Sequence, residues 1–170
     1  MTILCKTMCD MAYILDTNIF IRSKNEMPFD LWPSFWAKLQ QLVTSGQVYS
    51  CVMVKAEIDK GKDELTQWMR NNAPSLFFIP LDADIMAQYA ATQSWAASNA
   101  TFKPEARREY AINADAYLVA TAKAKGLTLV TYETADPNCR KRVKIPDACA
   151  ALGVEYCDFN TMIRQLGITI

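Results

Sequence analysis

Four carboxylates stand beside short apolar stretches of the sequence, where they could act together in a reaction. Asp16, Glu57 and Glu133 each follow such a stretch, and Asp115 lies in an alanine-rich segment that leads into another. Each acid alone is expected to be solvated or to cap a helix, as most Asp and Glu residues are. Their repeated position near the ends of apolar stretches predicts instead that they meet at one site.

The absence of histidine limits the chemistry of such a site. The chain has 18 acidic residues, 18 basic residues and no His, so it has neither an imidazole base nor a His metal ligand. Four unpaired carboxylates would repel one another and take up protons. A divalent cation relieves this conflict, and oxygen ligands suit Mg²⁺ or Mn²⁺. Since such an ion polarises water and stabilises charge on a phosphate, the acids predict metal-dependent phosphoryl chemistry.

Short β-type segments alternate with longer helical patterns along the chain. This alternation predicts a three-layer α/β/α fold with a central parallel sheet of about five strands. The expected strands cover residues 12–15, 48–54, 76–79, 127–131 and 154–157. The expected helices cover residues 29–43, 55–72, 83–98, a segment that starts at 103, 112–125, 146–152 and 158–166.

The predicted topology gathers the acids at one edge of the sheet. Right-handed connections place the carboxyl ends of parallel strands at the same edge, where α/β proteins bind ligands. Asp16 follows the first strand, Glu57 is expected in the first turn of the helix after the second, and Glu133 follows the fourth. Asp115 is expected one turn inside the helix that precedes that fourth strand.

Length and composition indicate one domain over residues 1–170, with an apolar content of 51% that is enough for a core. Residues 1–11 are interpreted as an extension that need not be ordered. Six cysteines without a C-x-x-C pair indicate buried thiols in a reducing compartment. No apolar run approaches the ~20 residues that cross a bilayer, so we expect a cytoplasmic protein with no membrane partner.

The segments that carry the four acids resemble the motifs of PIN-domain ribonucleases. They are Tyr-Ile-Leu-Asp-Thr-Asn ending at Asn18, Val-Lys-Ala-Glu-Ile around Glu57, Asn-Ala-Asp-Ala around Asp115, and Leu-Val-Thr-Tyr-Glu ending at Glu133. They occur in the family's order within residues 13–166. Singly the motifs are common patterns, and together they are fairly specific.

The fourth motif departs from the family's Thr-x-Asp-x-Asp pattern. Glu133 takes the place of the first Asp and Ala135 that of the second, with Asp136 one position further on. Either Glu133 or Asp136 is therefore the candidate for the fourth acid.

The resemblance implies cleavage of single-stranded RNA that depends on Mg²⁺ or Mn²⁺, with the four acids as catalytic, metal-binding residues. It also implies the toxin of a toxin–antitoxin pair, hence an antitoxin protein as partner, and a homodimer. Thr17, Asn18 and Thr131 would hold a carboxylate or a water beside the ion. The alternative is that they only cap helices or end a strand.

Two further groups of side chains are candidates for contacts with partners. Since the net charge is zero, affinity for a polyanion must come from a local patch or from bound metal. A basic cluster in the loop expected over residues 132–144 either binds the RNA backbone or is a solvated surface. An aromatic group either packs at least partly in the core or contacts an antitoxin or a second protomer. The basic cluster is Arg140, Lys141, Arg142 and Lys144, and the aromatic group is Trp32, Phe35 and Trp36.

Two other functions stay open at this stage. A catalytically inert PIN-like module that binds RNA or protein would have the same fold without metal-dependent cleavage. A DNA nuclease would use the same acids, because a carboxylate-held ion does not itself distinguish the sugars and no feature of the sequence reads a 2′-hydroxyl.

Overall fold

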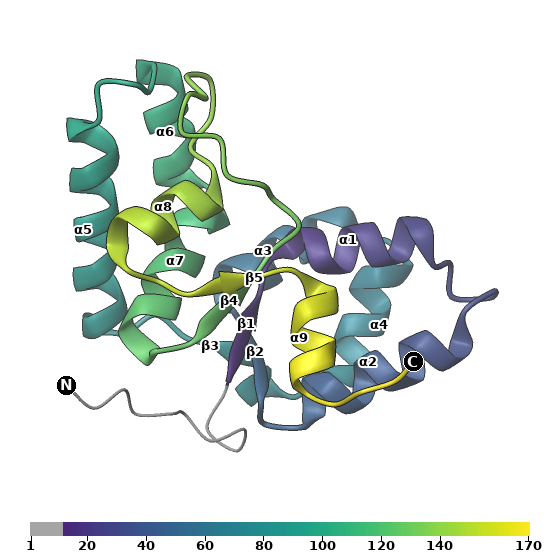
Figure 1. Cartoon of the computed structure of the whole chain (residues 1–170). Coiled ribbons are helices and arrows are strands. Elements are labelled where there is room, and N and C mark those ends of the chain that lie inside the picture. The colour runs from purple at the N-terminus through teal and green to yellow at the C-terminus, as the bar shows by residue number, and fades with distance from the viewer. Residues whose placement is uncertain (1–11) are drawn as a thin grey trace.

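Helices cover both faces of a central sheet in the computed structural model, which describes residues 12–170 (Figure 1). The interpretation of residues 1–11 as an extension therefore lies outside the described residues. Five parallel strands form the sheet in the spatial order β3-β2-β1-β4-β5. In chain order the strands are β1 (Tyr13–Leu15), β2 (Val48–Cys51), β3 (Phe78–Ile79), β4 (Thr128–Val130) and β5 (Tyr156–Cys157).

The connections between the strands are helical. The helices are α1 (Thr17–Glu26), α2 (Pro33–Thr44), α3 (Val52–Gly61), α4 (Glu64–Asn72), the 3₁₀ helix η1 (Ser75–Phe77), α5 (Ala83–Ser98), α6 (Pro104–Ile112), α7 (Ala114–Lys125), α8 (Ile145–Leu152) and α9 (Phe159–Gln165). None of the helices within the described residues is both long and apolar enough to span a membrane.

The strand order divides the molecule into two halves that meet between β1 and β4. From β1 the chain proceeds through β2 to β3, and α4 packs against α1 and α2 beside that half. It then returns to β4 and β5, and α7 packs against α5, α6 and α8 on the other side (Figure 1). The expected fold class, a three-layer α/β/α arrangement around a parallel sheet, is confirmed. Ligands of open α/β sheets bind where the strand order reverses, which here is the β1–β4 boundary.

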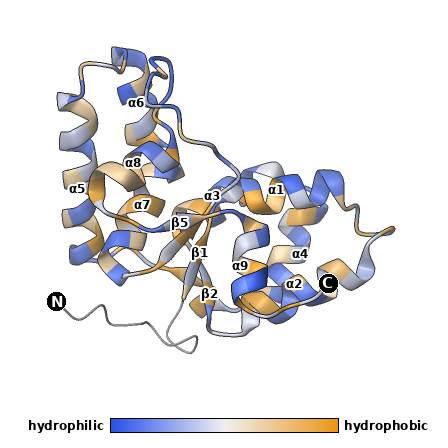
Figure 2. Ribbon diagram, in the orientation of Figure 1, coloured by the Kyte–Doolittle hydropathy of each residue, from blue (hydrophilic) through white to orange (hydrophobic). Residues whose placement is uncertain are grey.

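The core lies between the sheet and its covering helices. All three residues of β1 are completely buried, as expected for a parallel strand covered on both faces. Figure 2 shows the apolar residues concentrated on the strands and on the helix sides turned toward them. This packing fixes the strand ends, and with them the side chains that follow each strand.

The structure corrects the expected elements around the second strand. The strand predicted over residues 48–54 ends at Cys51, and its last apolar residues belong to α3. A short apolar run fits a buried strand or a buried helix turn equally well, so its period could not separate the two. The helix predicted over residues 55–72 is two helices, because Lys62 adopts a left-handed conformation with φ 51° and Asp63 caps α4. Glu57 therefore lies in the second turn of α3, not in its first.

Other boundaries also move. Helix α1 was not predicted, although its N-cap Asp16 was recognised as a possible cap. The helix expected over residues 112–125 is preceded by α6, which ends at Ile112, and Asn113 separates it from α7. Asp115 consequently lies in the first turn of α7, at the start of the helix rather than one turn inside it.

Candidate active site

The register of β1 and β4 places Asp16 beside Thr131 at the boundary between the two halves. Leu15 pairs with Val130 as the last residues of their strands, and the Asp16 N–H donates to the Val130 carbonyl over 3.0 Å. The Thr131 hydroxyl then donates to Asp16 Oδ2 over 2.8 Å. The two side chains that follow these strands are therefore joined directly.

Asp16 is a buried acid with few donors to balance its charge. It caps α1 by accepting the Asn18 N–H at 3.4 Å, and it is only 1% exposed. Burial, and after it the charge of the nearby Asp115 carboxylate, raise its pKa to about 7, although the hydrogen bonds from Thr131 and Asn18 oppose the shift. A nearby cation would favour the charged form of Asp16 and lower this pKa.

Glu57 connects three helices at the same edge. Its Oε2 accepts the Thr17 hydroxyl at 2.6 Å, and its Oε1 accepts the Ala114 N–H at the start of α7 at 3.3 Å. These bonds bring α1, α3 and α7 together around the strand ends. Thr17 thus positions a predicted acid, and Asn18 contributes its backbone N–H to Asp16 rather than a side-chain bond.

Asp115 and Glu133 share a guanidinium. Arg142 Nη2 lies 3.2 Å from Asp115 Oδ2 and 2.6 Å from Glu133 Oε1. The Asp115 and Glu133 side chains are 13% and 7% exposed, whereas that of Arg142 is 42% exposed. Burial, followed by the Glu133 charge, raises the pKa of Asp115 to about 6 despite the Arg142 contact. Arg142 was predicted as an RNA-binding residue, and the structure adds a role in neutralising two of the four acids.

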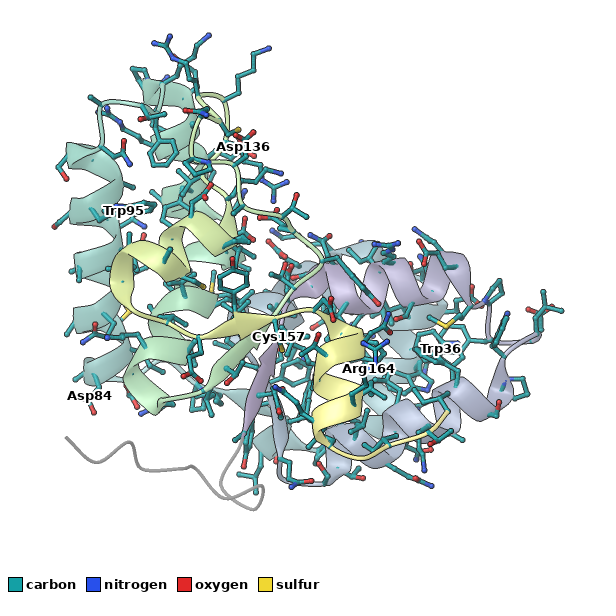
Figure 3. The ribbon with its side chains drawn as sticks, in the orientation of Figure 1. Trp36, Asp84, Trp95, Asp136, Cys157 and Arg164 are labelled. Atoms are coloured by element: carbon teal, nitrogen blue, oxygen red, sulfur yellow. The ribbon has the colours of Figure 1, made fainter. Side chains whose placement is uncertain are left out.

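Glu133 also closes the loop that follows β4. Its backbone N–H donates to the Thr131 hydroxyl over 3.1 Å, and its Oε2 accepts the Ile145 N–H at the start of α8 over 2.9 Å. Asp136, the alternative fourth acid, lies higher in this loop (Figure 3). There it is exposed, its Oδ1 accepts the Asn138 N–H, and its own N–H donates to Asp147. The structure thus brings Glu133 rather than Asp136 to the other acids.

The donor set fits a hard divalent cation in its chemistry. All four acids offer carboxylate oxygens at one edge of the sheet, and Asp16 is electrostatically coupled to both Asp115 and Glu133. Glu133 Oε1 is buried without a hydrogen bond, its charge facing only Arg142. As the side chains stand, the described residues contain no group of three acids or cysteines spaced to hold one ion. Ligation would require the carboxylates to close in and Arg142 to withdraw.

The rest of the predicted basic cluster is spread along the loop. Arg140 and Lys141 are exposed, and the Arg140 carbonyl accepts the Lys103 N–H at 2.9 Å. Lys144 and Arg142 line a hollow of about 430 Å³ between α1 and the loop, which Glu133 also borders. The same hollow includes Arg22, which sequence reasoning missed because α1 was not predicted.

Thr131 offers a direct test of how the acids are held. We expect Thr131→Val to lower the free energy of unfolding by about 1–3 kcal/mol, because it leaves the Glu133 N–H and the buried Asp16 oxygen without their partner. Urea denaturation measures the change. Thr121→Val is the matched control, since the buried Thr121 hydroxyl bonds only the Tyr117 carbonyl within α7. Equal losses for both variants would contradict a special role of Thr131.

The fold and the placement of the acids define a PIN-like α/β/α protein with an acidic site at the β1–β4 boundary. A family model, Domain of unknown function (DUF4411), matches residues 13–170, and the chain belongs to that family. The comparison with curated proteins gives no match.

Two solved structures share the fold. One is VapBC2 from Rickettsia felis bound to a DNA fragment from its promoter. It has 18% sequence identity and a TM-score of 0.57, and the match covers 87% of this chain and 98% of that one. The other is FitAcB from Neisseria gonorrhoeae, with 24% identity and a TM-score of 0.53, covering 85% and 95% of the two chains.

Proposed function

We propose that the protein is an endoribonuclease that cleaves single-stranded RNA and requires Mg²⁺ or Mn²⁺. The observation that carries the proposal is the buried pair Asp16 and Asp115, whose pKa values are raised to about 7 and about 6 beside further acids. Burying acids together costs folding free energy, and acids with strongly raised pKa values are found most often at functional sites. Its position where the strand order reverses, and the order of the four motifs, support the same function.

Each acid has a proposed part in the reaction. Asp16, Asp115 and Glu133 would hold the ion, and Glu57 would contribute from α3 while it keeps the start of α7 in place. A bound divalent ion supplies an activated water and stabilises the charge that develops on the phosphate. Thr131 orients the Asp16 carboxylate through the bond to Oδ2. Cleavage leaves 5′-phosphate and 3′-hydroxyl ends, as the resemblance implies.

The basic side chains at the hollow are proposed to bind the RNA backbone. Arg142 and Lys144 border the same 430 Å³ hollow as Glu133, so a phosphate held there lies beside the acids. With a divalent ion at the acids, Arg142 would be available to pair with a phosphate oxygen. Arg140 and Lys141 extend this positive surface along the loop.

The biological setting follows from the resemblance. We propose that the protein is the toxin of a toxin–antitoxin pair, acts in the cytoplasm, forms a homodimer and is restrained by an antitoxin protein.

A catalytically inert PIN-like binding module is the second candidate. The contact of Arg142 with Asp115 and Glu133 favours it, because a guanidinium already neutralises two of the acids without an ion. It predicts RNA or protein binding that is unaffected by EDTA.

The test is cleavage of a mixed panel of end-labelled single-stranded RNAs, with sequence-matched DNAs alongside, in Mg²⁺, Mn²⁺ or EDTA. We expect RNA fragments with 5′-phosphate ends in either metal and none in EDTA. RNA binding without cleavage in any metal would favour the inert module, and equal cleavage of DNA would overturn the assignment of RNA as substrate.

A further inference from the structure

A second hollow lies next to the one beside the acids. It has a volume of about 450 Å³ and lies between α1, the start of α2 and α9. We call it the aromatic hollow, and its lining includes Arg22, Trp32, Phe35, Tyr132, Phe159 and Ile163. Arg22, Glu26 and Tyr132 line both hollows, so these residues form a wall that the two spaces share. Each volume lies in the range of about 300–1,000 Å³ that small-ligand sites occupy.

Arg22 and Tyr132 form a stacked pair in the wall that the two hollows share. The guanidinium carbon of Arg22 lies 4.4 Å from the centre of the Tyr132 ring, and Arg22 Nε donates to Glu26 Oε1 over 2.6 Å. The Arg22 side chain is still 52% exposed. The planar Arg22 guanidinium therefore stays accessible to an RNA strand that lies across both hollows.

Trp32 presents an indole ring at the rim of the aromatic hollow. It is 49% exposed, yet its backbone is held in a turn, because its N–H donates to the Pro28 carbonyl over 2.9 Å and Pro33 follows as the first residue of α2. Phe35 and Phe159 are buried below, with ring centres 6.2 Å apart. The aromatic group is therefore divided, since Phe35 and Trp36 belong to the core and Trp32 faces the solvent.

We propose that the aromatic hollow binds a nucleobase of single-stranded RNA adjacent to the phosphate that lies at the acids. This inference rests on the proposed function. Proteins that bind single strands stack bases on exposed aromatic rings and Arg planes beside a positive track for the phosphates. Here Trp32 offers the ring, Arg22 the plane, and Arg142 with Lys144 the track. The hollow combines apolar walls with the charged pair of Arg22 and Glu26. A nucleotide fits this combination better than the apolar face of a partner helix does.

The test separates base binding from chemistry. On an RNA that the wild type cleaves, we expect Trp32→Ala to raise KM roughly 5- to 150-fold, the range for one lost stacking contact, with kcat within about twofold. Trp32→Phe should retain most of the affinity. An RNA with one abasic nucleotide beside the cleaved phosphate should have a KM for the wild type that is raised by a similar factor. The KM of Trp32→Ala should be the same for this RNA as for the intact one. Leu31→Ala, at a neighbouring residue that is 71% exposed, is the matched control.

Indole fluorescence gives a second measurement that needs no cleavage. RNA mixed with the Asp16→Asn protein in Mg²⁺ should quench part of the indole emission. The double variant Asp16→Asn with Trp32→Phe should not show this quenching. If wild type cleaves but Trp32→Ala keeps its KM on both RNAs, the base site is wrong and the nuclease stands. Quenching without any cleavage would support the base site and overturn the proposed function. No Trp32-dependent quenching would overturn the base site whether or not RNA is cut.

Discussion

The Asp16→Asn protein should be folded, more stable than wild type at pH 8 in EDTA, and at least about a thousandfold slower in RNA cleavage. A thousandfold loss corresponds to roughly 4 kcal/mol of transition-state stabilisation. The loss follows because Asn supplies a neutral oxygen where a charged ligand is needed. Cleavage of the labelled RNA in Mg²⁺ measures it. The gain in stability follows because the substitution removes a buried charge that the metal-free protein cannot balance.

The pH dependence of this gain has a definite sign. The Asp16 pKa is about 7 in the folded protein against an ordinary value of 3.8. The folded state therefore binds the proton more tightly, and the stability it gains at low pH is lost as the pH rises through that interval. The interval sets an upper limit of about 4 kcal/mol, at ~1.4 kcal/mol per pH unit. The stability difference between Asp16→Asn and wild type should vanish near pH 4 and reach its full value above pH 7.

Two matched variants make the Asp16 result specific. Asp84→Asn tests the effect of removing any acid, because Asp84 lies on α5 far from the site (Figure 3). Asp136→Asn tests the alternative fourth acid, and we expect it to cleave normally. Cleavage that survives Asp16→Asn in a folded protein would show that the proposed site is wrong or that the sample contains another nuclease.

The second large effect should come from Arg142. We expect Arg142→Gln to destabilise the metal-free protein by about 1–3 kcal/mol, because Asp115 and Glu133 lose the counter-charge that they share. The value is below that of a fully buried pair, since Arg142 is 42% exposed and solvent screens it. Saturating Mg²⁺ should remove most of the deficit, because the ion supplies the missing charge. Thermal unfolding with and without Mg²⁺ measures both effects.

The same substitution should tighten metal binding. The ion no longer has to displace a guanidinium from Asp115 and Glu133, so we expect an affinity for Mn²⁺ about tenfold higher, or roughly 1.4 kcal/mol. Arg140→Gln is the control, because Arg140 is an exposed arginine in the same loop. A variant that is no less stable than Arg140→Gln in EDTA would contradict the role given to the Arg142 contact.

Much of the architecture could be predicted because the central strands β1 and β4 are largely buried and appear in the sequence as apolar runs. The position of Asp16 followed directly, since it comes next after a fully buried strand. The β2–α3 boundary could not be placed, because a run such as Val-Met-Val fits either element. Helix α1 escaped prediction because its buried side is short and includes the polar residues Thr17 and Ser23.

The contacts within the site were less predictable than its composition. The Thr17–Glu57 bond joins residues 40 positions apart, and the Thr131–Asp16 bond joins residues 115 positions apart. Such bonds depend on strand register, which local patterns do not encode. Arg142 was found by its charge, but its pairing with Asp115 and Glu133 depends on how the loop after β4 returns to α8, which the sequence did not indicate.

That loop leaves and re-enters the fold at almost the same point, because the Glu133 carboxylate accepts the N–H of Ile145, twelve residues later. Because its two ends are held together, this loop can change in length or sequence without moving the strand and helix that it connects. Changing its length between the two anchored ends alters the closure entropy only slowly, by about 0.6 kcal/mol for each doubling. A chain that keeps Arg142 beside the acids could therefore vary the exposed tip with Arg140 and Lys141, and so change what it binds, without disturbing Asp115 and Glu133.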